Sequence, residues 1–331
     1  MKTTMKMMLS LLLLVASMGV MAQDKRMITV HNGNNLQVFY GDCFAAAVKA
    51  AQSGDTLTLS KGSFSGVTID KPLVIQGAGG YSDRSGTNID GNIIVKLPED
   101  DAEGLVIEGL YIGMRYPTYD YSYSNNNYLQ ISSYINKMIV RRCLIYRIMF
   151  NQQQTDSCRI EQCKTYELSG MQQCRDLFVT NSIVTVFNSP GTTGSVMADH
   201  CIISNLHDYV ICRNSYVYYH YTATEGTPLY NCIYVQQGSG SSQKIDCINV
   251  SNFGGCFTNG YSWDDTKSGV PVDPESTISI STDGTQIGIY GGTLGYSPYS
   301  LNPQITNSEI AREVDADGKL SVKITVEAAK E

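Results

Sequence analysis

Five arginines form the densest basic region of the sequence, and they are the first candidates for chemistry. A guanidinium group binds a carboxylate through two parallel hydrogen bonds, so arginines on neighbouring strands suit an acidic glycan. Glu161, Asp156 and Asp176 lie close enough in the sequence to pair with them instead, and we favour this interpretation. Arg141 and Arg142 remain candidates for catalysis. The five residues are Arg141, Arg142, Arg147, Arg159 and Arg175.

A second candidate for proton transfer is a group of histidines and aspartates around residue 200. His200 follows Asp199, and His207 precedes Asp208. A histidine beside a carboxylate can act as a general base, which makes His200 and Asp208 catalytic candidates. However, His200 directly precedes a cysteine, as Asn231 does further along the chain. That equivalence favours a residue at a bend.

Aromatic residues beside polar ones provide candidates for ligand binding. Tyrosine, asparagine and serine together offer flat apolar area and hydrogen-bonding groups, which suit sugar rings or a protein partner. Residues 116–127 have too little aliphatic content for a core strand, so we predict a long loop over one face. Loops of this length tend to be functional. The alternative is a row of rings that only adds stability. The tyrosines of this region are Tyr116, Tyr119, Tyr121, Tyr123, Tyr128 and Tyr134, and a second cluster contains Tyr216, Tyr218, Tyr219 and Tyr221.

The only tryptophan, Trp263, is followed by Asp264 and Asp265. Carboxylates beside an aromatic ring suit a sugar, so these three residues are candidate ligand contacts. Their simpler interpretation is a solvated loop tip, because adjacent residues of a strand point to opposite faces.

A repeated pattern predicts the elements that position these residues. A short apolar strand is followed by a polar residue, a cysteine or serine, and another apolar pair. Successive anchors at Cys143, Cys163, Ser182 and Cys201 are 20, 19 and 19 positions apart, and less regular copies follow at 232 and 247. A period near twenty predicts a solenoid whose coils contact only their neighbours. The polar residue before each anchor suits the bend, where asparagine and aspartate tolerate a left-handed backbone.

The ten cysteines leave three interpretations open. An even number in an exported chain is typical of disulfides. The equivalent places of Cys143, Cys163 and Cys201 in the repeat favour a stacked row of buried thiols instead. Zinc is the third interpretation, but Cys158 and Cys163 do not have a known zinc-knuckle spacing. We therefore expect no metal site.

The first 22 residues predict a signal peptide. Lys2 and Lys6 precede the apolar run 9–15, and residues 20–22 offer a cleavage site after Ala22. Cleavage would lower the formal charge from −7 to −9, which disfavours a nucleic-acid partner. The apolar run is too short to cross a membrane, and we expect no transmembrane segment. The predicted location is secreted or at the cell surface, with the periplasm as an alternative.

Residues 47–57, with Gly54-Asp55-Thr56, and the strands that follow to Gly77 resemble the N-terminal entry of right-handed parallel β-helix proteins of the pectate-lyase-like superfamily. The resemblance implies an all-β solenoid closed by an N-terminal capping helix. The sequence predicts that helix around residues 44–52, with Asp42 as its N-cap. Residues 279–299 look like the ending of secreted β-helix proteins from gut Bacteroidetes, whose roles are mostly unassigned. We expect the β-helix domain over 23–304, and a β-hairpin over 305–331 that covers the last coil.

Enzymes on the scaffold of this superfamily act on acidic polysaccharides with an arginine or lysine base and calcium, or with paired carboxylates. No full set of such residues is present in this sequence. Our leading hypothesis is therefore a secreted or cell-surface protein that binds a polysaccharide or a surface partner through its tyrosine-rich loops, without a cofactor. The alternatives are a polysaccharide lyase or glycoside hydrolase acting on an acidic polysaccharide, with calcium if it is a lyase, and a structural spacer or adhesin.

Overall fold

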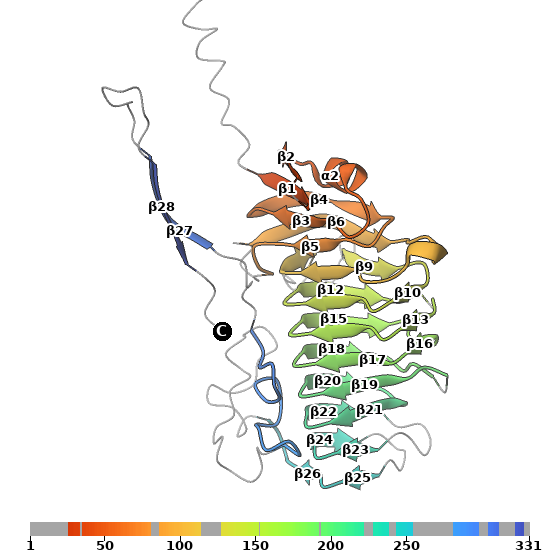
Figure 1. Cartoon of the computed structure of the whole chain (residues 1–331). Coiled ribbons are helices and arrows are strands. Elements are labelled where there is room, and N and C mark those ends of the chain that lie inside the picture. Colours follow the sequence, from red (N-terminus) through yellow and green to blue (C-terminus); the bar gives the residue numbers. More distant parts are fainter. Residues whose placement is uncertain are drawn as a thin grey trace, which may run out of the picture.

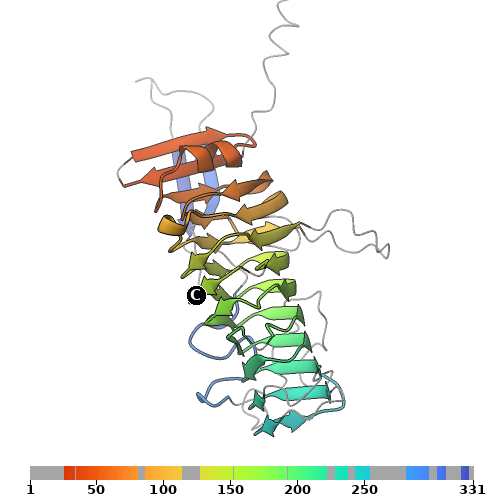
Figure 2. The ribbon, with the colours of Figure 1, turned by 90° about the vertical axis from the view of Figure 1, so that its right-hand side faces the viewer.

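The computed structural model describes residues 26–33, 35–80, 86–113, 127–151, 153–191, 193–221, 228–237, 243–253 and 281–297, and the backbone of 304–310 and 322–327. These residues form a parallel β-helix, in which short strands stack coil upon coil (Figure 1). The same continuous stack is seen from the side in Figure 2. The prediction of an all-β solenoid is confirmed.

Three sheets run along the stack, and we name them A, B and C. Sheet A contains, in spatial order, β2 (Asn35–Tyr40), β1 (Met27–Asn32), β3 (Thr56–Leu59), β5 (Val74–Gln76), β7 (Val106–Glu108), β11 (Ile139–Arg141), β14 (Arg159–Glu161), β17 (Leu177–Thr180), β19 (Val196–Asp199), β21 (Val210–Arg213), β23 (Leu229–Tyr230) and β25 (Lys244–Ile245).

Sheet B runs beside sheet A, and sheet C is a short third side. Sheet B contains β26 (Ile248–Asn249), β24 (Ile233–Gln237), β22 (Tyr216–His220), β20 (Ile202–Leu206), β18 (Ile183–Phe187), β15 (Lys164–Ser169), β12 (Leu144–Met149), β8 (Leu110–Ile112), β6 (Thr87–Val95) and β4 (Gly62–Ile69), with β9 (Tyr128–Ile131) paired to β12 and β6. Sheet C contains β10 (Ile135–Asn136), β13 (Thr155–Asp156) and β16 (Cys174–Arg175).

The core is built from rows of inward side chains that stack from coil to coil. In one row of sheet A, the parallel register places Val140 over Ile107 and Ile160 over Val140. Val179 and Ala198 continue this row, and every member is fully buried. Burying a side chain of this size stabilises the fold by about 1.5–3 kcal/mol, so the shared core holds coils that could not fold alone.

The N-terminal end is closed by the antiparallel strands β1 and β2 and by the helix α2 (Phe44–Ala50). This helix packs Phe44, Ala47 and Val48 into the end of the core. The prediction of a helix here is confirmed, but Asp42 is not its N-cap. The residue at that position is Cys43, and the Asp42 carboxylate instead accepts hydrogen bonds from the backbone and the hydroxyl group of Ser65 in β4.

Eight successive bends join sheet A to sheet B, and each contains one residue with a left-handed backbone. We call these residues the corner ladder. Apart from the first, which is a glycine, they carry side chains that point along one edge of the solenoid. The ladder consists of Gly109, Arg142, Gln162, Asn181, His200, Asn214, Asn231 and Asp246, with φ between 47° and 66°. The prediction that His200 lies at a bend equivalent to Asn231 is confirmed.

A cysteine or serine follows all but the first of these bends because the corner needs a small hydrogen-bonding side chain. The Cys163 thiol donates to the carbonyl of Glu161, and the Ser182 hydroxyl group donates to the carbonyl of Thr180. The same hydroxyl oxygen accepts the backbone N–H of Cys163 from the previous coil. These side chains therefore pair backbone groups at the corner. The described cysteines are free thiols, and those that follow the corner residues are buried except for the partly exposed Cys247, which agrees with the predicted row of thiols at equivalent corners.

The irregular spacing after Cys201 has a structural explanation. An additional coil turns at Asn214 and Ser215, and the Ser215 hydroxyl group donates to the carbonyl of Arg213 as the Ser182 hydroxyl group does to that of Thr180. This coil is only 14 residues long, because residues 207–209 alone join β20 to β21, whereas residues 188–195 join β18 to β19 in the coil before it.

Beyond the solenoid, β27 (Gln304–Ile310) and β28 (Val322–Glu327) pair antiparallel. The predicted role of this pair, as a cover for the last coil, stays a prediction. The signal peptide falls outside the described residues.

Candidate functional site

The outer surface of sheet B carries two adjacent columns of side chains, which we call the tyrosine face. The same strands point other side chains inward, and Ile145, Val184 and Leu206 are fully buried. The strand register aligns equivalent outward positions from one coil to the next. The first column is Tyr146, Tyr166, Thr185, Ser204 and Tyr218; the second is Arg147, Glu167, Val186, Asn205 and Tyr219; and Asn188, His207 and Tyr221 border the second column.

One end of the tyrosine face is a stacked pair of rings beside an ion pair. The rings of Tyr146 and Tyr166 are nearly parallel, with centroids 5.1 Å apart. The Arg147 guanidinium lies 5.9 Å from the Tyr146 ring and binds Glu167 at 2.7 Å. The other Glu167 oxygen accepts a 3.1 Å hydrogen bond from the Asn188 amide. This network holds the rings in a defined position.

The other end of the face is a second aromatic group. His207 stacks on Tyr221 with centroids 4.7 Å apart, and Tyr219 lies 4.2 Å from Tyr221. Tyr218 meets Phe253 edge to face at 5.8 Å. Tyr166, Tyr218 and Tyr221 keep 36–42% of their surface exposed, so these rings remain available to a ligand.

Short side chains separate the two aromatic groups. Thr185 and Ser204 occupy the first column between Tyr166 and Tyr218, and Val186 and Asn205 occupy the second. The Asn205 amide donates to the carbonyl of Thr185 at 3.3 Å. All four are partly exposed. The middle of the face therefore offers a low, largely polar floor between rings.

Burial keeps the histidines near this face uncharged at neutral pH. It lowers the pKa of His207, and the neighbouring Asp208 offsets this only in part. His220 points inward from β22, and burial, with a smaller effect of Lys244, lowers its pKa to about 4. His207 thus contributes a neutral ring.

Residues 281–297, which we call the strap, run back along the corner ladder. The Asn181 amide donates to the carbonyls of Ile289 and Gly291, at 3.0 and 2.6 Å. The Gln162 amide donates to the carbonyl of Gly295. Strap residues with higher numbers contact coils that come earlier in the sequence. The strap therefore runs antiparallel to the direction in which successive coils are added (Figure 1).

The strap also covers an apolar column at the flank of the tyrosine face. Ile183, Ile202 and Tyr216 begin successive strands of sheet B and point outward. They are nevertheless buried, because Ile287 and Ile289 of the strap pack over them. The strap therefore forms one border of the tyrosine face.

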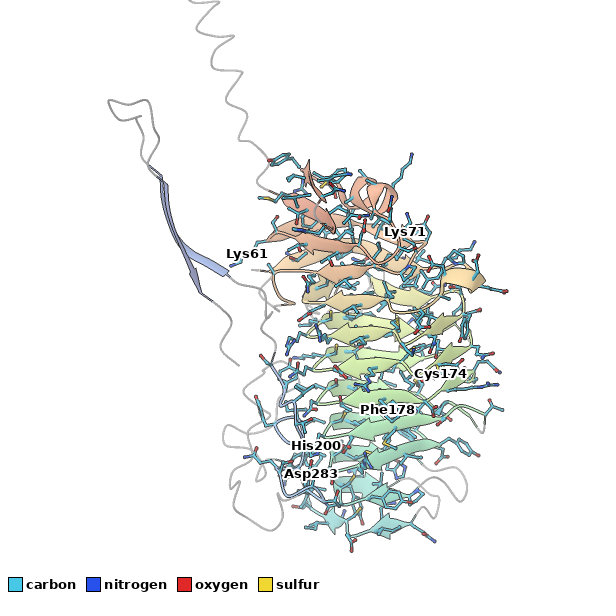
Figure 3. All side chains as sticks on the ribbon, in the orientation of Figure 1. Lys61, Lys71, Cys174, Phe178, His200 and Asp283 are labelled. Atoms are coloured by element: carbon cyan, nitrogen blue, oxygen red, sulfur yellow. The ribbon has the colours of Figure 1, made fainter. Side chains whose placement is uncertain are left out.

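His200, a catalytic candidate of the sequence, joins the ladder to the strap. Its Nε2 lies 3.1 Å from an Asp283 oxygen. Both residues are labelled in Figure 3. Burial alone would raise the pKa of Asp283, but hydrogen bonds from Ser281 and Thr285 and the adjacent His200 outweigh it, so this pKa lies well below its ordinary value. A Cβ on Gly291 would overlap the His200 ring, so only glycine fits there.

Arg141 and Arg142 share a partner that sequence reasoning missed. Both bind the buried carboxylate of Glu108, at 2.8 and 3.0 Å. Arg142 is itself buried. Of the acidic partners expected from the sequence, Glu161 contacts Arg159 at 3.6 Å. Arg141, Arg142 and Arg159 are thus paired with acidic groups, as the sequence favoured, but Arg141 and Arg142 bind Glu108 instead of an expected partner.

The other predicted site residues are dispersed. Tyr128 lies next to Arg147 in the second column, so it extends the tyrosine face. Asp208 is buried in the turn that follows β20. Tyr116, Tyr119, Tyr121, Tyr123, Trp263, Asp264 and Asp265 lie outside the described residues.

Sequence reasoning missed Tyr146, Tyr166 and Glu167 as site residues. Tyr146 and Tyr166 occur singly, three positions after Cys143 and Cys163. Their equal distance from the repeat cysteines is the signal that could have found them, because equivalent positions stack in a solenoid.

Comparisons of the chain with known protein families, curated proteins and solved structures find no significant match. Among the described residues, no helix has both the length and the apolar character of a membrane span. The same residues contain no group of three or more histidine, cysteine or acidic side chains arranged to hold a metal ion.

Proposed function

We propose that this chain is an exported β-helix protein that binds glycans at the cell surface through the tyrosine face. The observation that carries the proposal is the alignment of exposed rings on both sides of a polar floor. Tyr166 and Tyr218 present flat apolar surface, and Thr185 and Ser204 offer hydroxyl groups between them. Sugar rings have apolar faces and hydroxyl rims, so they match this combination of groups.

The position of these rings also supports the proposal. They extend from a rigid sheet, and the Arg147–Glu167–Asn188 network fixes one end of the face. Side chains that are held in place before binding lose less conformational entropy on binding. A ladder of rings that served stability alone would not need a polar interval in the middle of the column.

Export rests on the sequence of the first 22 residues. The resemblance of residues 47–77 to the pectate-lyase-like superfamily, and of 279–299 to secreted Bacteroidetes β-helix proteins, agrees with an extracellular role. We propose the cell surface as the location, with the periplasm as the alternative.

The described catalytic candidates do not favour an enzymatic alternative. Arg141 and Arg142 bind Glu108, and His200 binds Asp283. Each pair joins a coil to its neighbour or to the strap, so the proposal assigns these residues to structure and assigns no reaction to them.

The test is retention of the exported chain on a panel of immobilised neutral and acidic polysaccharides. We expect retention on at least one polysaccharide, lost in Tyr166→Ala and kept in Tyr230→Ala. Tyr230 is a matched control because it is similarly exposed but lies on sheet A. No retention on any glycan, or equal retention by both variants, would refute the proposal. Release of new reducing ends from the same panel would establish the enzymatic alternative instead.

A further inference from the structure

We infer that the tyrosine face takes an uncharged glycan of several sugar units, laid along the axis of the solenoid. This inference rests on the proposed function and narrows its ligand. It follows from three independent features of the described face: its charge balance, the spacing of its rings and the position of the strap.

The charges of the described face cancel within the protein. Arg147 binds one Glu167 oxygen, and the Asn188 amide occupies the other. His207 is neutral because burial lowers its pKa. An acidic glycan needs cations that are free to bind it, and a new ion pair with Arg147 would have to displace Glu167. The face as built therefore favours a neutral ligand.

The sequences that flank the face do not add net positive charge. Residues 114–126 lead to Asn127 and Tyr128, and they contain one arginine and one aspartate. Residues 222–227 follow Tyr221 and contain one glutamate and no basic residue. Both segments lie outside the described residues.

The spacing of the rings requires a ligand longer than one sugar. Tyr166 in β15 and Tyr218 in β22 are separated by β18 and β20. Strands of a sheet lie about 4.8 Å apart, which places these two positions roughly 14 Å from each other along the axis. A monosaccharide cannot contact both rings, whereas an oligosaccharide can stack on Tyr166 and Tyr218 and cross the floor at Thr185 and Ser204.

The strap sets the direction of the ligand. It covers the column of Ile183, Ile202 and Tyr216 beside the first column of the face. A glycan that lay along the strands would meet this cover, whereas one parallel to the axis crosses successive strands and follows the repeat of rings and polar side chains. The axis is therefore the direction in which the face continues.

Calorimetric titration of the exported chain tests the inference, with neutral oligosaccharides from one to six sugars and an acidic series of equal lengths. We expect no measurable binding of the neutral monosaccharide and rising affinity with length. Acidic ligands should bind at least about tenfold more weakly than neutral ones of the same length. Tyr166→Ala and Tyr218→Ala should each lower the affinity for the longest neutral ligand about tenfold, and Tyr230→Ala should leave it unchanged.

Glu167→Gln tests the role of charge, because it removes the carboxylate that neutralises Arg147. This variant keeps an acceptor for Asn188 but releases the charge of Arg147, so affinity for acidic ligands should rise at least about tenfold. Circular dichroism would verify that each variant is folded. Asn188→Ala is the control, because it removes only the hydrogen bond from the Asn188 amide to Glu167. Asn188→Ala keeps the Arg147–Glu167 pair, so it should leave the preference for neutral ligands intact.

The outcomes separate the two proposals. Tighter binding of acidic ligands, no dependence on length, or no gain in Glu167→Gln would overturn this inference while glycan binding itself stands. Failure of every glycan to bind would remove both. Binding that is lost equally in Tyr230→Ala would place the site elsewhere on the solenoid.

Discussion

Glu108 is the most consequential buried charge among the described residues, and its replacement by glutamine is expected to destabilise the protein strongly. Its side chain is 3% exposed and binds both Arg141 and Arg142, of which Arg142 is only 9% exposed. Glutamine has nearly the same shape, so the substitution removes the negative charge and leaves the buried guanidinium without compensation. Breaking a buried ion pair from one side costs about 3–5 kcal/mol.

The expected effect is measurable as a shift in the melting temperature. For a domain of this size, each kcal/mol lowers the melting temperature by about 2–4 °C, so Glu108→Gln should melt roughly 6–20 °C below the wild type. Circular dichroism at a fixed heating rate measures this shift. Glu103→Gln is the matched control, because Glu103 lies in the same coil and pairs with Lys137 while both side chains are more than half exposed. Such a surface pair contributes about 0–1 kcal/mol.

A double variant tests the cause. Adding Arg142→Asn to Glu108→Gln removes the uncompensated cation and introduces asparagine, which other bends of the ladder use at Asn181 and Asn214. Part of the lost stability should return. If Glu108→Gln melts within a degree or two of Glu103→Gln, or the double variant melts lower still, the reasoning about a buried, uncompensated charge is wrong.

Three further predictions concern the cysteines and the strap. Burial raises the pKa of Cys158 to about 11 and of Cys201 to about 12, so a chromogenic disulfide reagent at pH 8 should label the eight buried thiols of the described residues slowly in the native protein and quickly after unfolding; rapid native labelling of more than two of the ten thiols, which leaves room for the partly exposed Cys247 and for Cys256 outside the described residues, would contradict the buried row. Asn181→Ala should cost about 1–2 kcal/mol through its left-handed backbone, plus the two hydrogen bonds to the strap, whereas Asn181→Gly should lose only the bonds and melt higher than Asn181→Ala. Because the folded pKa of Asp283 is depressed, its contribution to stability is present at neutral pH and is lost as the pH falls below about 4, so Asp283→Asn should flatten the acid side of the stability curve; an unchanged acid slope would show that Asp283 does not contribute to it.

The coil repeat was predictable because each corner has the same local requirement. A left-handed residue followed by a small donor satisfies the backbone in every coil, so Asn181-Ser182 and Asn231-Cys232 leave a visible signature. The coil at Asn214 escaped notice for a different reason. Its anchor, Ser215, is a serine like Ser182, but it follows Cys201 by only 14 positions, which is outside the spacing of 19 to 20 that identified the repeat.

The candidate site could not be predicted in the same way, because its members are distant in the sequence. Tyr146 and Tyr166 lie in separate coils, and only the parallel register brings their rings together. Glu108 precedes Arg142 by 34 positions, so the nearer Glu161 looked like the better partner. The strap has no periodicity at all, and its contact with His200 spans 83 positions.

The strap changes how this solenoid is expected to come apart. A stack whose coils touch only their neighbours can fray from an open end, one coil after another. Here a single segment contacts the corners at Gln162, Asn181, His200 and Asn214 at the same time. Releasing any one of these coils requires loosening of a segment that also holds the other three. These coils should therefore open as one cooperative unit, with similar hydrogen-exchange rates in their backbone amides, while the coils beyond the reach of the strap exchange independently.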